Sequence, residues 1–215
     1  MTVTEERPVE SPAVAIPAQA QATSAAARKA MIDSQLRPSG VNEPWILDAM
    51  GTIPREDFVP AEMKEAAYID RAIPLGNGRM LGAPLVQGRL LAEARPTQSD
   101  KALLVGDGNG YLAALLRPLV GSLATIDPAD AARPGAADGE NDYSLLIIDG
   151  AVEVLPEAVA DRLAEGGRIV TGQVLRGVTR IAVGRKAVGD VTLLPLTEIG
   201  IPVLAEFAAP KRWEF

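Results

Sequence analysis

The stretch KALLVGDGNGYLAALL, residues Lys101 to Leu116, decides the fold of this 215-residue chain. It begins with a short apolar run, which is typical of a strand buried in a parallel sheet. Three glycines follow at positions 106, 108 and 110, and an apolar segment with helical spacing starts at Tyr111. The stretch therefore predicts a strand, a glycine loop and a helix, a unit with which many proteins bind nucleotide-like cofactors.

Further apolar runs indicate other strands of the same sheet. SLATID ends on Asp127 and YSLLIID ends on Asp149, and the segment LPEAVADRLAEGG that follows is expected to be helical. Strands that alternate with helices predict a mostly parallel, doubly wound α/β sheet. The segments VTRIAVGRK and DVTLLPLTEI predict an antiparallel pair that turns around residues 186–190.

The chain is expected to contain a tail and two larger parts. Residues 1–28 are rich in Ala, Pro, Glu, Ser and Thr without a sustained period, which predicts a disordered tail. Residues 29–98 predict short helices and a loop-like segment with several glycines, and a helix is expected to begin at Pro84. Residues 99–215 are expected to form the α/β domain, with a β-rich C-terminal part.

The composition excludes several classes of chemistry and of partner. A net charge of −7 and a pI near 4.8 argue against a nucleic-acid-binding or anionic-membrane surface. The sequence has no cysteine and no histidine, which excludes thiol nucleophiles, disulfides and the Ser-His-Asp arrangement, and we expect no metal site. No apolar run approaches the ~18 residues of a membrane-spanning helix, so the cytoplasm is the expected location.

The spacing of the loop glycines narrows the kind of cofactor. A dinucleotide-binding loop has the pattern G-x-G-x-x-G, and this chain carries Tyr111 where the third glycine of that pattern would stand. The spacing of this chain, G-x-G-x-G, is closer to that of S-adenosylmethionine-dependent methyltransferases. Asp127, at the end of the next strand, is placed to accept hydrogen bonds from both ribose hydroxyls. The alternatives are a glycine turn that only permits tight strand–helix packing, and an aspartate that only caps a strand end. The predicted cofactor-binding residues are Gly106, Asp107, Gly108, Gly110, Tyr111 and Asp127.

Several motifs give the chain a resemblance to a known family. MIDSQLRPSGVNEPWILDAMGTIPREDFVP, AYIDRAIPLGNG, the glycine loop and RLAEGGRIV follow one another as in the protein-L-isoaspartate O-methyltransferases. The resemblance covers roughly residues 28–170. It implies a Rossmann-like class I methyltransferase fold with an N-terminal helical extension, S-adenosylmethionine as cofactor, and a protein or peptide substrate. In such enzymes the carboxylate of an isoaspartyl residue attacks the methyl group of the sulfonium, which repairs damaged proteins.

The chain also departs from the family pattern. Gly82 stands where the family carries its active-site serine, and Leu104 stands where a glutamate usually precedes the glycine loop. Arg79 and Asp149 remain as candidate catalytic or substrate-binding residues; the alternatives are a solvated loop arginine and a carboxylate that caps the turn at Gly150.

The segment after Asp127 is short. Only the fifteen residues PADAARPGAADGEND separate Asp127 from the next strand, which predicts the loss of one edge strand and one helix. SLATID would then be the sheet edge, one wall of the adenine pocket would be missing, and cofactor binding would be weak or lost. Three hypotheses stay open: an active isoaspartyl methyltransferase, a catalytically inactive member that serves as a binding or scaffold module, and an enzyme for another nucleotide-like ligand.

Overall fold

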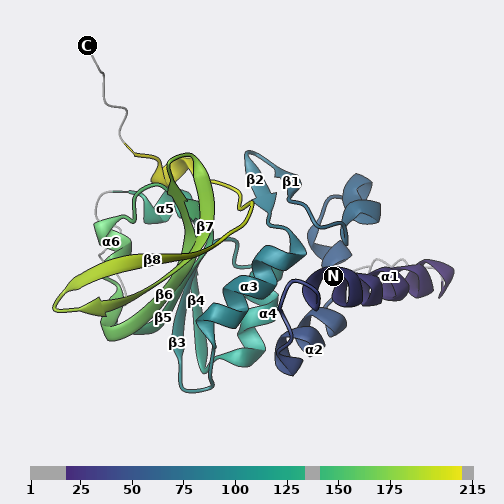
Figure 1. The fold of residues 1–215 in the computed structure, drawn as a ribbon, viewed down its shortest axis with the longest axis horizontal. Coiled ribbons are helices and arrows are strands. Elements are labelled where there is room, and N and C mark those ends of the chain that lie inside the picture. Colours follow the sequence, from purple (N-terminus) through teal and green to yellow (C-terminus); the bar gives the residue numbers. More distant parts are fainter. Residues whose placement is uncertain (1–17, 134–140, 210–215) are drawn as a thin grey trace, which may run out of the picture.

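The computed structural model describes residues 18–133 and 141–209, and six of its strands form one central sheet (Figure 1). The strand order is β4-β3-β5-β6-β7-β8. The first four strands in this order are parallel, and β7 and β8 are added antiparallel. The strands are β3 (Lys101–Val105), β4 (Ser122–Ile126), β5 (Tyr143–Val152), β6 (Leu163–Leu175), β7 (Val178–Ala187) and β8 (Asp190–Glu198).

Short helices cover both faces of the sheet, as the doubly wound prediction requires. Helices α3 (Pro84–Ala94) and α4 (Tyr111–Leu116) pack on one face, where Leu104 is buried. The one-turn helices α5 (Pro128–Ala131) and α6 (Glu157–Ala160) pack on the other, where the neighbouring Leu103 is buried. Successive strand residues thus enter two separate cores, because side chains alternate across a strand. The Rossmann-like fold class is confirmed.

The N-terminal part is helical and corrects the predicted tail. Helix α1 (Ala18–Met31) runs into a π-helical turn (Ile32–Leu36), and α2 (Pro44–Thr52) and two 3-10 turns (Arg55–Phe58 and Ala61–Ala66) follow. The prediction of disorder for residues 18–28 is therefore wrong, and residues 1–17 lie outside the described residues. Helix α1 is anchored because Arg28 donates to the Tyr68 hydroxyl and to the Gly51 carbonyl. The division near residue 98 stays a prediction.

Two segments differ from the predicted elements. The loop-like segment contains an antiparallel hairpin, β1 (Ile73–Gly76) and β2 (Arg79–Leu81), because Asn77 and Gly78 adopt the positive φ angles that a tight hairpin turn needs. The helix predicted over residues 155–167 is confined to α6. Residues 163–167 belong to β6 instead, where Leu163 pairs with Tyr143, and this pairing overrides the local helical pattern.

The edges of the sheet agree with the prediction that SLATID, which precedes the short connector, is an edge strand. Strand β4 is the edge strand among the described residues, and β7 and β8 form the predicted antiparallel pair. Residues 134–140 of the connector lie outside the described residues. No helix in the described ranges is long and apolar enough to cross a membrane.

The C-terminal segment returns to the sheet beside the end of β5. The Ala151 amide donates to the Pro202 carbonyl at 2.8 Å, and the Leu204 amide donates to the Ala151 carbonyl at 2.9 Å. A 3-10 turn (Ala205–Phe207) follows, and its Phe207 is buried in the second core. The backbone pairing brings residues 202–206 to the carboxyl ends of the parallel strands.

Candidate cofactor and substrate site

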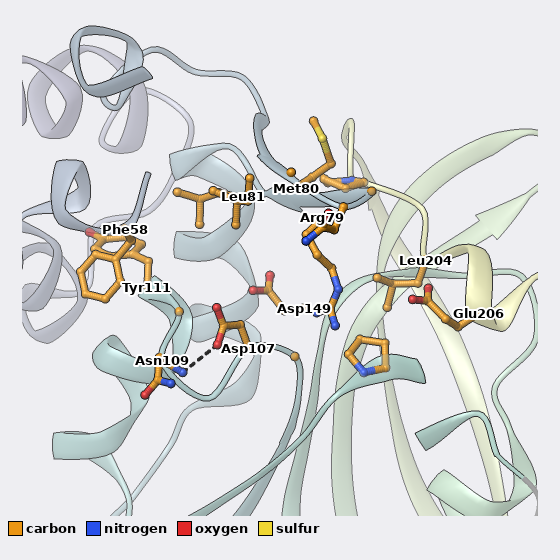
Figure 2. A pocket seen from close by; sticks show the side chains of 18 of the residues that line it. Phe58, Arg79, Met80, Leu81, Asp107, Asn109, Tyr111, Asp149, Leu204 and Glu206 are labelled. Atoms are coloured by element: carbon orange, nitrogen blue, oxygen red, sulfur yellow. Dashed lines mark hydrogen bonds between the residues drawn. The ribbon is translucent and has the colours of Figure 1, made fainter. Parts of the chain in front are cut away.

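A cavity of about 630 Å³ opens at the carboxyl ends of the parallel strands, where α/β proteins bind their ligands (Figure 2). The glycine loop forms one wall, the hairpin residues 75–81 form a second, and residues 202–206 form a third. Three segments far apart in the sequence therefore meet at one site. The third wall was missed at the level of sequence, because no local motif marks a chain end that returns to the sheet.

The glycine loop lies where the sequence predicted it, directly after β3. Gly106 and Gly110 line the cavity, together with Asp107, whose carboxylate accepts a hydrogen bond from the Asn109 amide at 2.9 Å. None of the three predicted glycines has a positive φ angle. Gly108 is required for space instead, because a Cβ there would lie 2.5 Å from Thr125 Oγ1 of β4. These glycines bring the loop backbone close to the sheet and leave the cavity side open.

Tyr111 borders the cavity but is not an exposed ligand contact. Its side chain is fully buried, and its ring lies 5.4 Å from the ring of Phe58. Its hydroxyl has no hydrogen-bond partner among the described residues, and burial raises the pKa of this phenol. Tyr111 therefore supports the wall between the glycine loop and the N-terminal part.

Behind Tyr111 lies a buried arginine, Arg55, at the start of a 3-10 turn, and no sequence pattern indicated its role. Arg55 is fully buried, and its guanidinium lies 5.2 Å from the Tyr111 ring. It donates hydrogen bonds to the carbonyls of Ala67 and Gly82 and to Gln87 Oε1. Burial lowers the pKa of Arg55 to about 10, so it stays charged at neutral pH. Arg55 ties the base of the hairpin to α3 and thereby fixes the second wall of the cavity.

The cavity is acidic. Burial raises the pKa of Asp149 to about 6; the charge of Asp107 acts in the same direction, whereas Arg55 and the Gln87 amide oppose it. Arg79 is the only cation among the described residues that line the cavity. It stands against four carboxylates, those of Asp57, Asp107, Asp149 and Glu206. A lining of this charge favours a ligand that carries positive charge.

Asp127 and Arg79 form an ion pair. The sequence predicted Asp127 as a ribose ligand and Arg79 as a candidate substrate-binding residue, but it did not predict that the two are paired. One Asp127 oxygen caps α5 by accepting from the Ala129 amide at 2.9 Å, and the other is paired with the Arg79 guanidinium. Burial alone would raise the pKa of Asp127, but the Ala129 amide and Arg79 outweigh it and lower the pKa. Arg79 lines the cavity and Asp127 does not. Arg79 is thus not a solvated loop arginine. In this structure its guanidinium is paired with Asp127, so it is not available to a substrate.

The two positions that depart from the family pattern both lie away from the cavity. Gly82 is buried, and its carbonyl accepts the hydrogen bond from Arg55. Leu104 is fully buried in the core beneath α3 and α4. Among the described residues neither position lines the cavity, whereas Asp149 and Arg79 do.

Comparison with known proteins gives the family. The model of the protein-L-isoaspartate(D-aspartate) O-methyltransferases (PCMT) matches residues 26–130. A protein-L-isoaspartate O-methyltransferase of Koribacter versatilis is 36% identical over 166 residues, which cover 66% of this chain and 74% of that protein. One of Methylorubrum populi is 31% identical over 201 residues, which cover 80% of this chain and 95% of that protein. The chain belongs to the protein-L-isoaspartate O-methyltransferase family.

Solved structures agree with this family at the level of the fold. The chain resembles the crystal structure of a putative protein-L-isoaspartate O-methyltransferase from Plasmodium falciparum in complex with S-adenosyl-L-homocysteine, with a TM-score of 0.68. The match covers 83% of this chain and 98% of that one at 16% sequence identity. The resemblance on the N-terminal motifs and the methyltransferase fold are therefore both confirmed.

A serine at position 82 tests how much the missing hydroxyl matters in this member of the family. A Cβ at Gly82 would meet Val86 Cγ1 at 3.6 Å, an ordinary contact, and the φ angle of Gly82 is not positive. For Gly82→Ser we expect the free energy of unfolding to change by less than about 1 kcal/mol. Because Gly82 does not line the cavity, we expect kcat/KM for methyl transfer to change by less than about threefold.

The Gly82→Ser variant is measured by urea denaturation and by initial rates beside the parent protein. Gly108→Ser is the matched control, since its added Cβ would clash with Thr125 Oγ1 and should reduce stability. A large gain in rate for Gly82→Ser would contradict this expectation. It would show that the hydroxyl reaches the acceptor and that glycine at this position limits the rate of methyl transfer.

Proposed function

We propose that this chain transfers the methyl group of S-adenosylmethionine to the carboxylate of isoaspartyl residues in damaged proteins. The observation that carries the proposal is the acidic cavity at the glycine loop, in a chain that belongs to this family. Its volume of about 630 Å³ lies within the range of small-molecule sites. The cofactor has a sulfonium, an ammonium and one carboxylate, so its net charge is positive and matches the lining.

The residues present fit the cofactor in chemical type. The backbone of residues 106–110 would lie against its amino acid end, and Asp107 and Asp149 would face its positive charges. Asp127 would accept the ribose hydroxyls after Arg79 has moved away. Pro128, which follows β4, and Leu204, which lies beside the end of β5, give the cavity an apolar surface that the adenine would contact. When bound, the cofactor supplies an electrophilic methyl group on a positively charged sulfur.

The chain itself has little acid–base chemistry to perform. The acceptor carboxylate is already a nucleophile at neutral pH, so the protein has to align it with the methyl group and to exclude water. Phe58, Leu75 and Met80 contribute apolar surface to the cavity wall, and Met80 is 39% exposed on the hairpin. We propose that the hairpin contacts the peptide backbone around the isoaspartyl residue. The absence of histidine is compatible with this reaction.

A second candidate function is that of a catalytically inactive binding module that keeps the fold. The Arg79–Asp127 ion pair favours it, because the guanidinium covers the carboxylate that the ribose would need. Gly82, in the place of the family's serine, favours it as well. In either function, the proposed location is the cytoplasm, and the partner is a protein or peptide rather than a nucleic acid or a membrane.

Methyl transfer to two peptides of identical sequence separates these candidates. One peptide carries an isoaspartyl linkage and the other carries a normal aspartyl linkage, and both are incubated with S-adenosylmethionine labelled in its methyl group. We expect base-labile label on the isoaspartyl peptide alone. Label on neither peptide, in a protein that binds S-adenosylhomocysteine, would refute the methyltransferase and leave the binding module.

A further inference from the structure

The Arg79–Asp127 ion pair lies at the edge of the cavity and joins segments 48 residues apart. Arg79 comes from β2 of the hairpin, and Asp127 directly follows β4 as the N-cap of α5. In Figure 2 the Arg79 side chain extends from the hairpin into the space between Asp149 and Leu204. The side chains of Arg79 and Asp127 are 33% and 40% exposed, so the pair is accessible to solvent and can be exchanged.

This pair competes with a ribose for the same carboxylate. A ribose diol donates two hydrogen bonds and needs acceptor oxygens that face the cavity. In the structure one Asp127 oxygen is taken by the Ala129 amide and the other by Arg79. Each carboxylate oxygen can accept a second hydrogen bond, so the obstacle is the position of the guanidinium. Arg79 rather than Asp127 lines the cavity, so a ribose that approaches from the cavity meets Arg79 first and has to displace it.

Two carboxylates of the reactants could then receive the released guanidinium, that of the cofactor and that of the acceptor. The backbone of residues 106–110 would lie against the amino acid end of the cofactor, so the acceptor carboxylate is the partner that remains. The remaining charged groups that line the cavity are carboxylates, and they repel an anionic acceptor. An arginine fork binds a carboxylate through two hydrogen bonds, so it offsets this repulsion and also orients the acceptor. The same side chain therefore opposes cofactor binding in the empty protein and favours acceptor binding in the loaded protein.

We propose that Arg79 is an exchange residue: it holds Asp127 in the cofactor-free protein and passes to the acceptor carboxylate when the ribose takes Asp127. The cofactor consequently binds before the acceptor, and the bound cofactor increases the affinity for an isoaspartyl peptide. This inference rests on the proposed function, since it assumes that the cavity binds S-adenosylmethionine. Arg79 acts here as a positioning residue for the acceptor.

The test uses Arg79→Gln, which removes the charge but keeps a side chain that can form hydrogen bonds. Affinity for S-adenosylhomocysteine is measured by calorimetry on the full chain, and affinity for the isoaspartyl peptide is measured with and without saturating S-adenosylhomocysteine. Arg71→Gln is the matched control, because Arg71 is an exposed arginine that precedes the hairpin and does not line the cavity.

Opposite changes in the two affinities are the expected result. Arg79→Gln should bind S-adenosylhomocysteine about three- to tenfold more tightly, because no ion pair has to be broken. It should bind the peptide about tenfold or more weakly in the presence of S-adenosylhomocysteine. Arg71→Gln should change neither affinity. A purely structural role of Arg79 would lower both affinities and would overturn the exchange.

Failure of the inference is distinguishable from failure of the proposed function. If the parent and Arg79→Gln bind S-adenosylhomocysteine equally, the exchange is wrong and the proposed function stands. If Arg79→Gln binds it and the parent does not, the exchange is supported. If neither protein binds it at millimolar concentration, the proposed function is wrong and the exchange is overturned with it.

Discussion

Replacing Asp149 with asparagine is expected to raise the free energy of unfolding by about 2 kcal/mol at pH 7.5 and to weaken the binding of S-adenosylhomocysteine about tenfold. Burial raises the pKa of Asp149 from 3.8 to about 6 in the folded protein. A carboxyl whose folded pKa exceeds its unfolded pKa binds protons more strongly in the folded state. Its ionisation therefore destabilises the fold progressively between about pH 4 and pH 6 and fully above that range.

Asparagine removes this cost because it is never charged. At pH 4 Asp149 is protonated, so the variant and the parent should have similar stability, and the difference should develop as the pH rises past 6. Affinity should fall because, in the proposed function, Asp149 would face the ammonium that S-adenosylhomocysteine shares with the cofactor. The variant would then be more stable than the parent but would bind the ligand more weakly, as expected for a group whose unfavourable ionisation serves a binding site.

Urea denaturation at several pH values between 4 and 8 measures the stability effect, and calorimetry measures the affinity. Asp57→Asn is the control, since Asp57 is an exposed carboxylate that also lines the cavity. Its stability effect should stay within about 0.5 kcal/mol at every pH. A stability difference for Asp149→Asn that does not change with pH would contradict the assignment of a half-buried carboxylate whose ionisation destabilises the fold.

Replacing Arg55 with leucine is expected to lower the free energy of unfolding by about 4 kcal/mol. The substitution leaves three buried acceptors without their donor: the carbonyls of Ala67 and Gly82 and Gln87 Oε1. It also removes the guanidinium that lies 5.2 Å from the Tyr111 ring. Because Gly82 directly follows β2, the hairpin wall of the cavity should loosen as well.

Urea denaturation followed by circular dichroism measures this loss. Arg55→Lys keeps the charge but cannot supply three donors in the same plane, so its loss should be smaller, about 2 kcal/mol, and it remains measurable if the leucine variant fails to fold. Arg71→Leu, at an exposed position, should cost less than about 0.5 kcal/mol. Equal losses for Arg55→Leu and Arg71→Leu would show that the Arg55 network does not hold the hairpin.

The elements that the sequence predicted correctly are those whose signal is local. The strand, loop and helix of residues 101–116 follow from consecutive residues, and the helix at Pro84 follows from the position of a proline before an apolar stripe. The antiparallel pair β7–β8 follows from two apolar runs around a short turn. In these places local preference and the final fold agree.

The features that the sequence did not reveal depend on contacts between distant residues. Nothing near Asp127 shows that Arg79 will pair with it, and nothing near Arg55 shows that Gly82 and Gln87 will bury it. Residues 163–167 have a helical pattern but join β6, because Tyr143 lies beside them. Several predicted site residues line the cavity, and their roles stay predictions. The partners that set their charge and accessibility were not predicted.

Calorimetric titration of S-adenosylhomocysteine, the demethylated product of the cofactor, into the full chain tests the central claim most directly, because it asks whether the cavity binds the adenosyl and amino acid parts of the cofactor. We predict one binding site with a dissociation constant in the micromolar range, and weaker binding by Asp149→Asn. Absence of any binding heat at millimolar S-adenosylhomocysteine would contradict the account.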